Sequence, residues 1–311
     1  MRERTKGDSD VSEDFEREFD LEGIGHLHEC GKPGKRLIIL LHGFMQSGSS
    51  WRQIAPLLKT HHVLAPDLLG HGKTTFEAGQ SLDLDAYVAQ LDALIEWVKQ
   101  GDPSGKTREV SLVGYSMGGR IAALYATRYP EKIASLVLES AGLGPRTAEE
   151  RADRVKKNAS MIARLDQSIA VDPAAPLRCF VNHWEALPLF ESQSELDEHT
   201  RAQLRSERLA NDPEALRCNL EQAGQHRMED LRPALARLNK PLLYLVGERD
   251  VAYTEIARSL MRAWAESNTC SSPFEQGFIQ VSVIPQTGHN IHLEAPEEYA
   301  RIVETFLSRS S

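Results

Sequence analysis

Short apolar runs alternate with longer amphipathic stretches along most of the chain. Runs rich in Val, Ile and Leu predict strands at residues 36–42, 62–65, 109–115, 135–139, 241–247 and 278–284. Several of these runs are apolar on both faces, which is typical of the buried middle of a parallel sheet. The stretches between them predict helices at residues 50–59, 84–100, 117–128, 254–266 and 296–308. The alternation indicates βαβ units in a doubly wound α/β sheet.

One long segment, residues 145–237, breaks this rhythm because it is helical in pattern and rich in charge, with no convincing strand. Since α/β sheets bind ligands beyond the carboxyl ends of their strands, we expect a helical cap there. The alternative is a separate helical domain with no role at the site. Residues 15–144 and 238–311 would then form the core, while residues 1–14 have almost nothing to bury and are expected to be disordered.

Composition narrows the function classes. The net charge of −9 over 311 residues argues against a nucleic-acid partner, although a local basic pocket for a small anion remains compatible with it. No apolar run approaches the roughly 18 residues needed to span a bilayer. The charged start has no apolar segment typical of a secretion signal, and the cysteines form no CxxC pair. We therefore expect a cytoplasmic protein with reduced thiols and no stable membrane insertion. The oligomeric state stays open.

The sequence GYSMG at residues 114–118 follows an apolar strand and opens a predicted helix. This is the GxSxG nucleophile elbow in the context it requires. The serine of such an elbow sits on a tight turn, where side chains at the flanking glycine positions would clash. We predict that Ser116 is the reactive residue.

Backbone N–H groups near Ser116 are candidates to stabilise negative charge. The loop after the strand ending at His42 supplies one such donor in folds of this kind, and the residue after the nucleophile supplies the other. The predicted oxyanion donors are therefore Phe44 and Met117. The plain alternative for His42-Gly43 is a strand-to-loop turn.

The acid and the base should follow Ser116 along the chain. Asp250, shortly after a predicted strand, is the preferred acid, and Glu248 is its rival. His289, in a loop near the C-terminus, is the preferred base, and His292 is the alternative. A buried acid would orient the imidazole while the other ring nitrogen takes the serine proton.

We expect no metal and no cofactor. His289 and His292 are three residues apart and no HExxH occurs, which argues against a zinc site there. Gly72-Lys73-Thr74 lacks the earlier glycine of a phosphate-binding loop, and no GxGxxG follows the first predicted strand.

These stretches resemble the α/β-hydrolase superfamily, and the resemblance implies an α/β-hydrolase fold with a helical cap inserted after the sixth strand. More specific motifs resemble the 2-succinyl-6-hydroxy-2,4-cyclohexadiene-1-carboxylate (SHCHC) synthases of menaquinone biosynthesis. They are LHGF at 41–44 with Gly48 and Trp51, DLLGHG at 67–72, 114–120, Phe180 and Trp184 with LPLF at 187–190, Arg205 with RLAN at 208–211, 247–250 and 288–292. The resemblance extends from about residue 37 to the C-terminus.

The resemblance implies a lyase that eliminates pyruvate from a cyclohexene carrying several carboxylates, with Ser116 abstracting a ring proton. Such a small polyanionic substrate requires arginines, which bind carboxylates in a bidentate manner. Arg120 is the first candidate, followed by Arg154 and Arg205 of the cap. Trp184 would line the pocket and Tyr115 would donate a hydrogen bond; the alternative role for Trp184 is packing, and for Arg120 a surface ion pair.

Three features depart from the family pattern: the charged N-terminal extension, the long segment 268–276, and the segment AGQHR at 223–227. Two other functions therefore stay open. One is a serine carboxylesterase that forms an acyl-serine intermediate. The other is a non-catalytic ligand receptor on the same fold.

Overall fold

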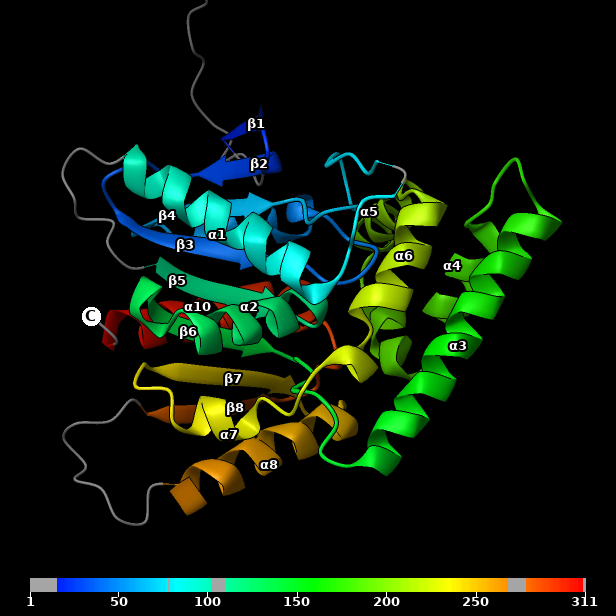
Figure 1. Ribbon diagram of the computed structural model, residues 1–311. Coiled ribbons are helices and arrows are strands. Elements are labelled where there is room, and N and C mark those ends of the chain that lie inside the picture. The colour runs from blue at the N-terminus through cyan, green and yellow to red at the C-terminus, as the bar shows by residue number, and fades with distance from the viewer. Residues whose placement is uncertain (1–15, 78, 102–109, 268–277, 310–311) are drawn as a thin grey trace, which may run out of the picture.

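A computed structural model describes residues 16–77, 79–101, 110–267 and 278–309, and its centre is one eight-stranded sheet (Figure 1). The strand order is β1-β2-β4-β3-β5-β6-β7-β8. β1 pairs antiparallel with β2, β2 pairs antiparallel with β4, and all other pairs are parallel. This mostly parallel sheet confirms the predicted fold class. The strands are β1 (Arg17–Leu21), β2 (Gly25–Cys30), β3 (Arg36–Leu41), β4 (His61–Pro66), β5 (Val110–Tyr115), β6 (Ile133–Glu139), β7 (Leu242–Gly247) and β8 (Ile279–Ile284).

Helices cover both faces of the sheet because the central strands are apolar on both sides. In β3, Ile39 and Leu41 pack toward one face and Ile38 and Leu40 toward the other, and all four are fully buried. Removing aliphatic side chains from water in this way is the main favourable term in folding. One face carries α1 (Leu84–Gln100), α2 (Met117–Arg128), α7 (Arg232–Ala236) and α8 (Val251–Ser267), and the other carries α9 (Ile291–Glu294) and α10 (Pro296–Arg309).

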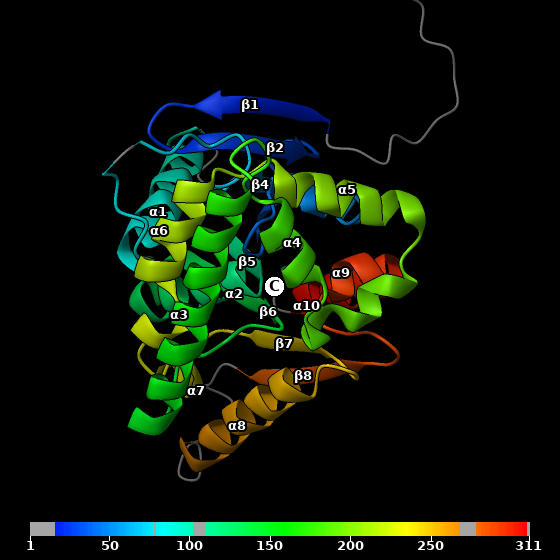
Figure 2. The same ribbon diagram turned by 90° about the vertical axis from the view of Figure 1, so that its right-hand side faces the viewer.

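Most of the segment between β6 and β7, before α7, folds into helices that lie beyond the carboxyl ends of the parallel strands (Figures 1 and 2). They are α3 (Ala148–Val171), α4 (Arg178–Glu185), α5 (Glu198–Leu209) and α6 (Pro213–Ala223), with 3₁₀ turns at Pro188–Glu195 and Gln225–Arg227. A separate apolar cluster seats this cap on the core, with Met45 from the core packed among Phe180, Leu216 and neighbouring cap residues. The cap therefore covers the edge of the sheet at which the predicted reactive residues meet.

The predicted helix at residues 50–59 is wrong. The chain instead forms two 3₁₀ turns, Gly48–Trp51 and Ala55–Leu57. Pro56 lies in the second turn, and because proline lacks a backbone N–H it prevents a continuous α-helix across this segment.

The N-terminal strands β1 and β2 were not predicted. Their sequences REFDL and GHLHEC carry few aliphatic residues, so no apolar run marks them. Two expectations, disorder in residues 1–14 and a long segment at 268–276, fall outside the described residues.

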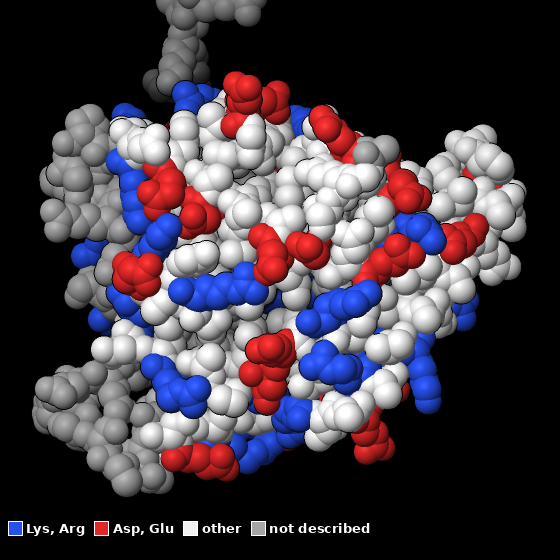
Figure 3. All heavy atoms as spheres, viewed as in Figure 1, with Lys and Arg blue, Asp and Glu red and all other residues white. Residues whose placement is uncertain are grey.

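Charges of both signs are interspersed on the face in Figure 3, and Lys and Arg form no continuous patch there. Among the described helices, none combines the length and the apolar character needed to cross a membrane.

Candidate active site

Ser116 occupies the turn between β5 and α2. Its backbone has φ 50° and ψ −102°, the strained conformation expected of a nucleophile elbow. The turn is tight enough that a Cβ on Gly114 would meet Gly118 O at 2.5 Å, and one on Gly118 would meet Leu41 O at 2.2 Å. Both glycines of the GYSMG motif are therefore required by backbone packing.

His289 connects Ser116 to a buried carboxylate. Its Nε2 lies 3.2 Å from Ser116 Oγ, and its Nδ1 lies 2.7 Å from Asp250 Oδ2. His289 is 2% exposed and Asp250 is 4% exposed, so water competes little for either contact. The Tyr253 ring lies 4.5 Å from the imidazole and restricts its rotation. The three preferred residues thus form one hydrogen-bonded row across separate segments of the chain.

The alternative base and acid lie elsewhere. His292 is fully buried, with Nδ1 2.8 Å from Glu139 Oε2 and its ring stacked on Trp51 at 4.1 Å between centroids. Glu248 is exposed and accepts a hydrogen bond from the backbone N–H of Gln286. Neither contacts Ser116, so the geometry favours His289 and Asp250.

The two predicted backbone donors border the same pocket as Ser116. Met117 is the first residue of α2, so its N–H has no helical partner. Within the described chain, no hydrogen bond engages the N–H of Phe44 either. Both groups are therefore available to an oxygen that carries negative charge beside Ser116.

His42 fixes the loop that carries Phe44. Its Nδ1 donates to Gly43 O at 2.8 Å, and its Nε2 accepts the N–H of Leu68 at 2.9 Å. These roles require a neutral ring. Burial accordingly lowers the pKa of His42 from its ordinary value near 6.5 to about 3.

The pocket around Ser116, of about 270 Å³, is positively charged in a protein of net charge −9. Four basic residues line it, Arg120, Arg154, Lys157 and Arg208, and none of its described lining residues is Asp or Glu. The other lining residues are Phe44, Gln46, Tyr115, Ser116, Met117, Asn158, Met161, Trp184, Leu189, Phe190, Asn219, Leu220, Gly224, Gln225, Tyr253 and His289. We call this cavity the Ser116 pocket.

Arg120 is 7% exposed, and among the four cations only Arg208 is more deeply buried. Its guanidinium donates to Ala223 O at 2.6 Å, and no carboxylate of the described chain pairs with it. Burial lowers the pKa of Arg120 to about 10, which still leaves it charged at neutral pH. A buried arginine without an acidic partner is a favourable place for an anionic ligand, because such a ligand would compensate its charge.

The cap supplies the other cations. Arg154 and Lys157 come from α3, and the Arg154 guanidinium hydrogen-bonds to Gln225. The ring of Trp184 packs at a tilt against those of Phe44 and Phe190, each with a centroid distance of 5.3 Å, so it forms part of the pocket wall. The structure therefore places Arg120, Arg154, Trp184 and Tyr115 in the lining of the pocket that contains Ser116, and their binding of substrate stays a prediction.

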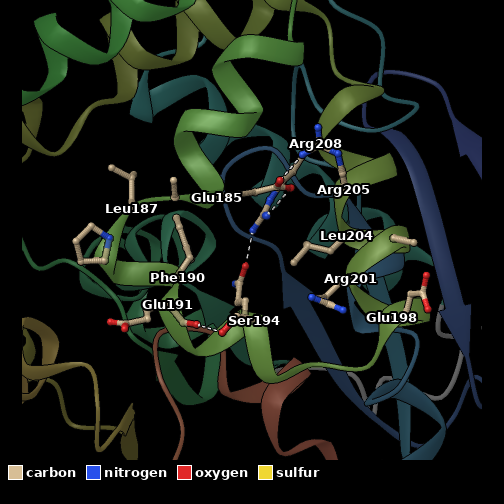
Figure 4. Close-up of a pocket in the computed structure, with 14 residues that line it drawn as sticks. Glu185, Leu187, Phe190, Glu191, Ser194, Glu198, Arg201, Leu204, Arg205 and Arg208 are labelled. Carbon is tan, nitrogen blue, oxygen red and sulfur yellow. Dashed lines mark hydrogen bonds and ion pairs between the residues drawn. The ribbon is translucent and has the colours of Figure 1, made fainter.

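The prediction for Arg205 does not fit this geometry. Arg205 lines a neighbouring cavity of about 700 Å³ between α5 and the turn at residues 188–195 (Figure 4). There its guanidinium pairs with Glu185 and donates to Asn182. Arg208, three residues further along α5 and 4% exposed, also pairs with Glu185, at 3.1 Å, but it lines both this cavity and the Ser116 pocket. The two arginines differ in direction because three residues rotate a helix by about 300° rather than a full turn.

Several lining residues were not predicted: Gln46, Lys157, Arg208, Asn219, Gln225 and Tyr253. Gln225 lies in the segment AGQHR, which departs from the family pattern. That departure was the feature of the sequence that could have identified Gln225 as a pocket residue. Its amide nitrogen donates to the Tyr253 hydroxyl at 3.3 Å. For Arg208 the spacing along the cap helix gave no means of choosing it over Arg205.

Comparisons with known proteins agree with this architecture. A family model described as "alpha/beta hydrolase fold" matches residues 36–296. A Bacillus subtilis (strain 168) protein that is provisionally named 2-succinyl-6-hydroxy-2,4-cyclohexadiene-1-carboxylate synthase is 30% identical over 279 residues, which cover 89% of this chain and 92% of that protein. The Yersinia pestis (strain Pestoides F) synthase of the same name is 30% identical over 275 residues, 88% of each chain. The solved structure of MenH from S. aureus superposes with a TM-score of 0.77 at 28% identity, covering 91% of this chain and 98% of that one.

Proposed function

The chain belongs to the α/β-hydrolase-fold family and, within it, to the SHCHC synthases, and from that membership we propose its reaction. It eliminates pyruvate from 2-succinyl-5-enolpyruvyl-6-hydroxy-3-cyclohexene-1-carboxylate and forms SHCHC. The enzyme is then a carbon–oxygen lyase of menaquinone biosynthesis. It has the fold of a hydrolase but catalyses an elimination and not a hydrolysis.

One observation supports this choice above all: four cations line the Ser116 pocket, and two of them, Arg120 and Arg154, pair with no carboxylate of the described residues, whereas Lys157 and Arg208 pair with Asp153 and Glu185. The proposed substrate has a carboxylate on its ring, one on its succinyl chain and one on its enolpyruvyl group. Arginines at separate points of the wall can each bind one of these groups in a bidentate manner. A neutral ester would leave the buried charge of Arg120 without compensation.

The positions of the double bonds determine which proton leaves. The substrate has its double bond between C3 and C4, and the product has double bonds at C2 and C4. The proton is therefore lost from C2, the pair of electrons forms the C2–C3 double bond, and the old double bond moves to C4–C5. The C5–O bond breaks with its electrons on oxygen, and the enolpyruvate that leaves takes up a proton to become pyruvate.

The residues around Ser116 match these demands. Ser116 Oγ takes the C2 proton while its own proton passes to Nε2 of His289, 3.2 Å away. Asp250 stabilises the imidazolium from the other side of the ring. Since C2 is adjacent to the succinyl carbonyl, negative charge develops on that oxygen, where the N–H groups of Phe44 and Met117 can receive it.

The decisive experiment supplies the cyclohexene substrate to purified protein and measures pyruvate with a lactate dehydrogenase couple. We expect stoichiometric pyruvate and SHCHC from the wild-type protein and only background release from Ser116→Ala. Wild-type release no faster than that of Ser116→Ala would reject the proposal.

A carboxylesterase is the second candidate, because a serine, a histidine and backbone donors in this geometry also suffice for acyl transfer. A burst of p-nitrophenol from a short-chain ester, followed by rapid steady turnover, would support it. We expect slow turnover, since Arg120 and Arg154 have no carboxylate partner among the described residues and a neutral ester would leave their charges uncompensated.

A further inference from the structure

The strands β1 and β2 place three metal-binding side chains together at the edge of the sheet. His26 and His28 are two residues apart on β2, so their side chains point to the same face. Glu18 on β1 lies directly opposite His28 in the antiparallel register. Neighbours across an antiparallel pair share a face, so all three side chains converge.

One ligand atom from each of the three side chains lies within 4.8 Å of the other two, and two of the contacts have the spacing of a metal's ligand shell. His26 Nε2 lies 3.3 Å from Glu18 Oε2, and His28 Nδ1 lies 3.2 Å from Glu18 Oε1. Charge-assisted hydrogen bonds are shorter, at about 2.7–2.9 Å. Ligand atoms of a tetrahedral zinc ion with bonds of about 2.0–2.1 Å stand about 3.3–3.4 Å apart.

Each histidine also has a carboxylate on its other ring nitrogen. His26 Nδ1 is 2.8 Å from Asp20 Oδ1, and His28 Nε2 is 3.1 Å from Asp67 Oδ1. A carboxylate in that position holds the proton on the outer nitrogen and directs the lone pair of the inner nitrogen toward the metal. For both rings the inner nitrogen is the one that faces Glu18.

Asp67, the carboxylate that contacts the outer nitrogen of His28, is held rigidly in place. It is 1% exposed, and its carboxylate accepts the backbone N–H groups of Gly48 and Lys73, each at 2.7 Å. The ring of His28 is therefore oriented by a buried group that the core itself holds in place.

We propose that Glu18, His26 and His28 form a zinc-binding site, with water as the fourth ligand, that joins β1 to β2 within the N-terminal hairpin. Two imidazoles and one carboxylate are a ligand set that zinc accepts readily. The ion would hold the two strands together, since Glu18 comes from β1 and both histidines come from β2, and the site shares no residue with the Ser116 pocket. The inference is independent of the proposed reaction.

Lys73 competes for the same carboxylate. Its Nζ lies 2.6 Å from Glu18 Oε2, close to where the ion would lie. The Lys73 side chain is 63% exposed, so it can turn into solvent when a dication takes its place. Removing this ammonium should therefore strengthen zinc binding.

The test is zinc titration by calorimetry of tag-free, reduced protein from which metal has been removed, together with the visible spectrum of bound Co²⁺. We expect one ion per chain and tetrahedral cobalt bands, and zinc should raise the melting temperature. Asp20→Asn, which alters only the outer shell, should weaken binding by about 10–100-fold. Glu18→Gln and His26→Gln should weaken it further, and Lys73→Ala should strengthen it.

His62→Gln is the matched control, because His62 pairs with Glu29 at 2.8 Å on the same sheet without a third ligand. It should leave zinc binding unchanged. Equal zinc uptake by wild type and Glu18→Gln would assign the metal to thiols or other surface groups and overturn the proposal, as would a lack of uptake by the wild type. Glu18 has a half-exposed side chain, so its variant remains informative even if His26→Gln fails to fold.

Discussion

Asp250 and His289, 39 residues apart in sequence, lie with Oδ2 and Nδ1 2.7 Å from each other in a nearly water-free environment. The opposite nitrogen of the same ring faces Ser116. The loop after β7 and the loop after β8 thus meet at the elbow that follows β5, because β5, β6, β7 and β8 are successive parallel neighbours. The sheet order itself brings the acid and the base to the serine.

Replacing Asp250 by Asn should lower kcat by roughly 10³–10⁴-fold, the scale seen when the acid of such a row becomes an amide and the imidazole takes the wrong tautomer. Pyruvate release under saturating substrate measures the effect. Glu248→Gln is the control and should keep wild-type turnover, since Glu248 is exposed and contacts the backbone of Gln286. The reverse order of effects would identify Glu248 as the acid.

Replacing Arg120 by Ala should weaken substrate binding by about 1.5–3 kcal/mol, the usual contribution of a hydrogen bond to a charged group. The expected result is a KM increase of roughly 10–150-fold at a similar kcat. Arg201→Ala, in the neighbouring cavity, is a control that should leave both parameters unchanged. An unaltered KM in Arg120→Ala would remove Arg120 from the substrate site.

Arg205 and Arg208 provide a matched pair on one helix. Only Arg208 lines the Ser116 pocket, so Arg208→Ala should raise KM by about tenfold or more, the effect of losing one charged hydrogen bond. Arg205→Ala should change KM less than about twofold, because its contacts are Glu185 and Asn182. Steady-state kinetics of both variants would decide, and equal effects would contradict the assignment of Arg208 rather than Arg205 to the Ser116 pocket.

His292→Ala should reduce stability more than chemistry. It leaves the fully buried carboxylate of Glu139 without its imidazole partner, so the free energy of unfolding should fall by at least about 2 kcal/mol. Urea denaturation measures this loss. At a temperature where the variant is folded, its kcat should stay within about tenfold of wild type, whereas His289→Ala should lose nearly all turnover. Loss of turnover in folded His292→Ala would make His292 the base.

The buried histidines His42 and His71 should make the fold sensitive to mild acid. Burial lowers the pKa of His42 to about 3 and that of His71 to about 4, from ordinary values near 6.5. Below pH 6.5 the unfolded chain therefore binds protons that the folded protein does not. Stability should fall as the pH drops from about 6.5 to 4.5, by up to about 1.4 kcal/mol per pH unit for each histidine.

Urea midpoints across this pH range test the effect, and His71→Gln should remove one histidine's share of the slope. Identical slopes in wild type and His71→Gln, or a wild-type protein that gains stability on acidification, would contradict it.

The sequence predicted those features that a short, contiguous stretch of residues specifies by itself. The elbow could be found because its glycines, the apolar strand before it and the helix after it are contiguous, and Asp250 and His289 followed from their order behind strands. Arg208 could not be distinguished from Arg205, because the choice depends on how α5 rotates against the core.

Other features were missed because tertiary context outweighs local pattern. The strands β1 and β2 hold polar side chains that pair with one another, so they lack the apolar runs by which the central strands were found. Pro56 lies in a segment whose apolar spacing predicted a helix, and the missing N–H divided that segment into two short turns.

The cations of the Ser116 pocket belong to two different parts of the fold. Arg120 projects from α2 of the core, whereas Arg154, Lys157 and Arg208 project from cap helices. Lys157 and Arg208 are paired with Asp153 and Glu185, whereas Arg120 and Arg154 have no carboxylate partner among the described residues and repel each other across the core and the cap. A molecule with several negative groups would turn this repulsion into attraction. The ligand would thus bridge the cap and the core. Substrate binding and cap closure would then be coupled, so that a change in the free energy of one changes the free energy of the other.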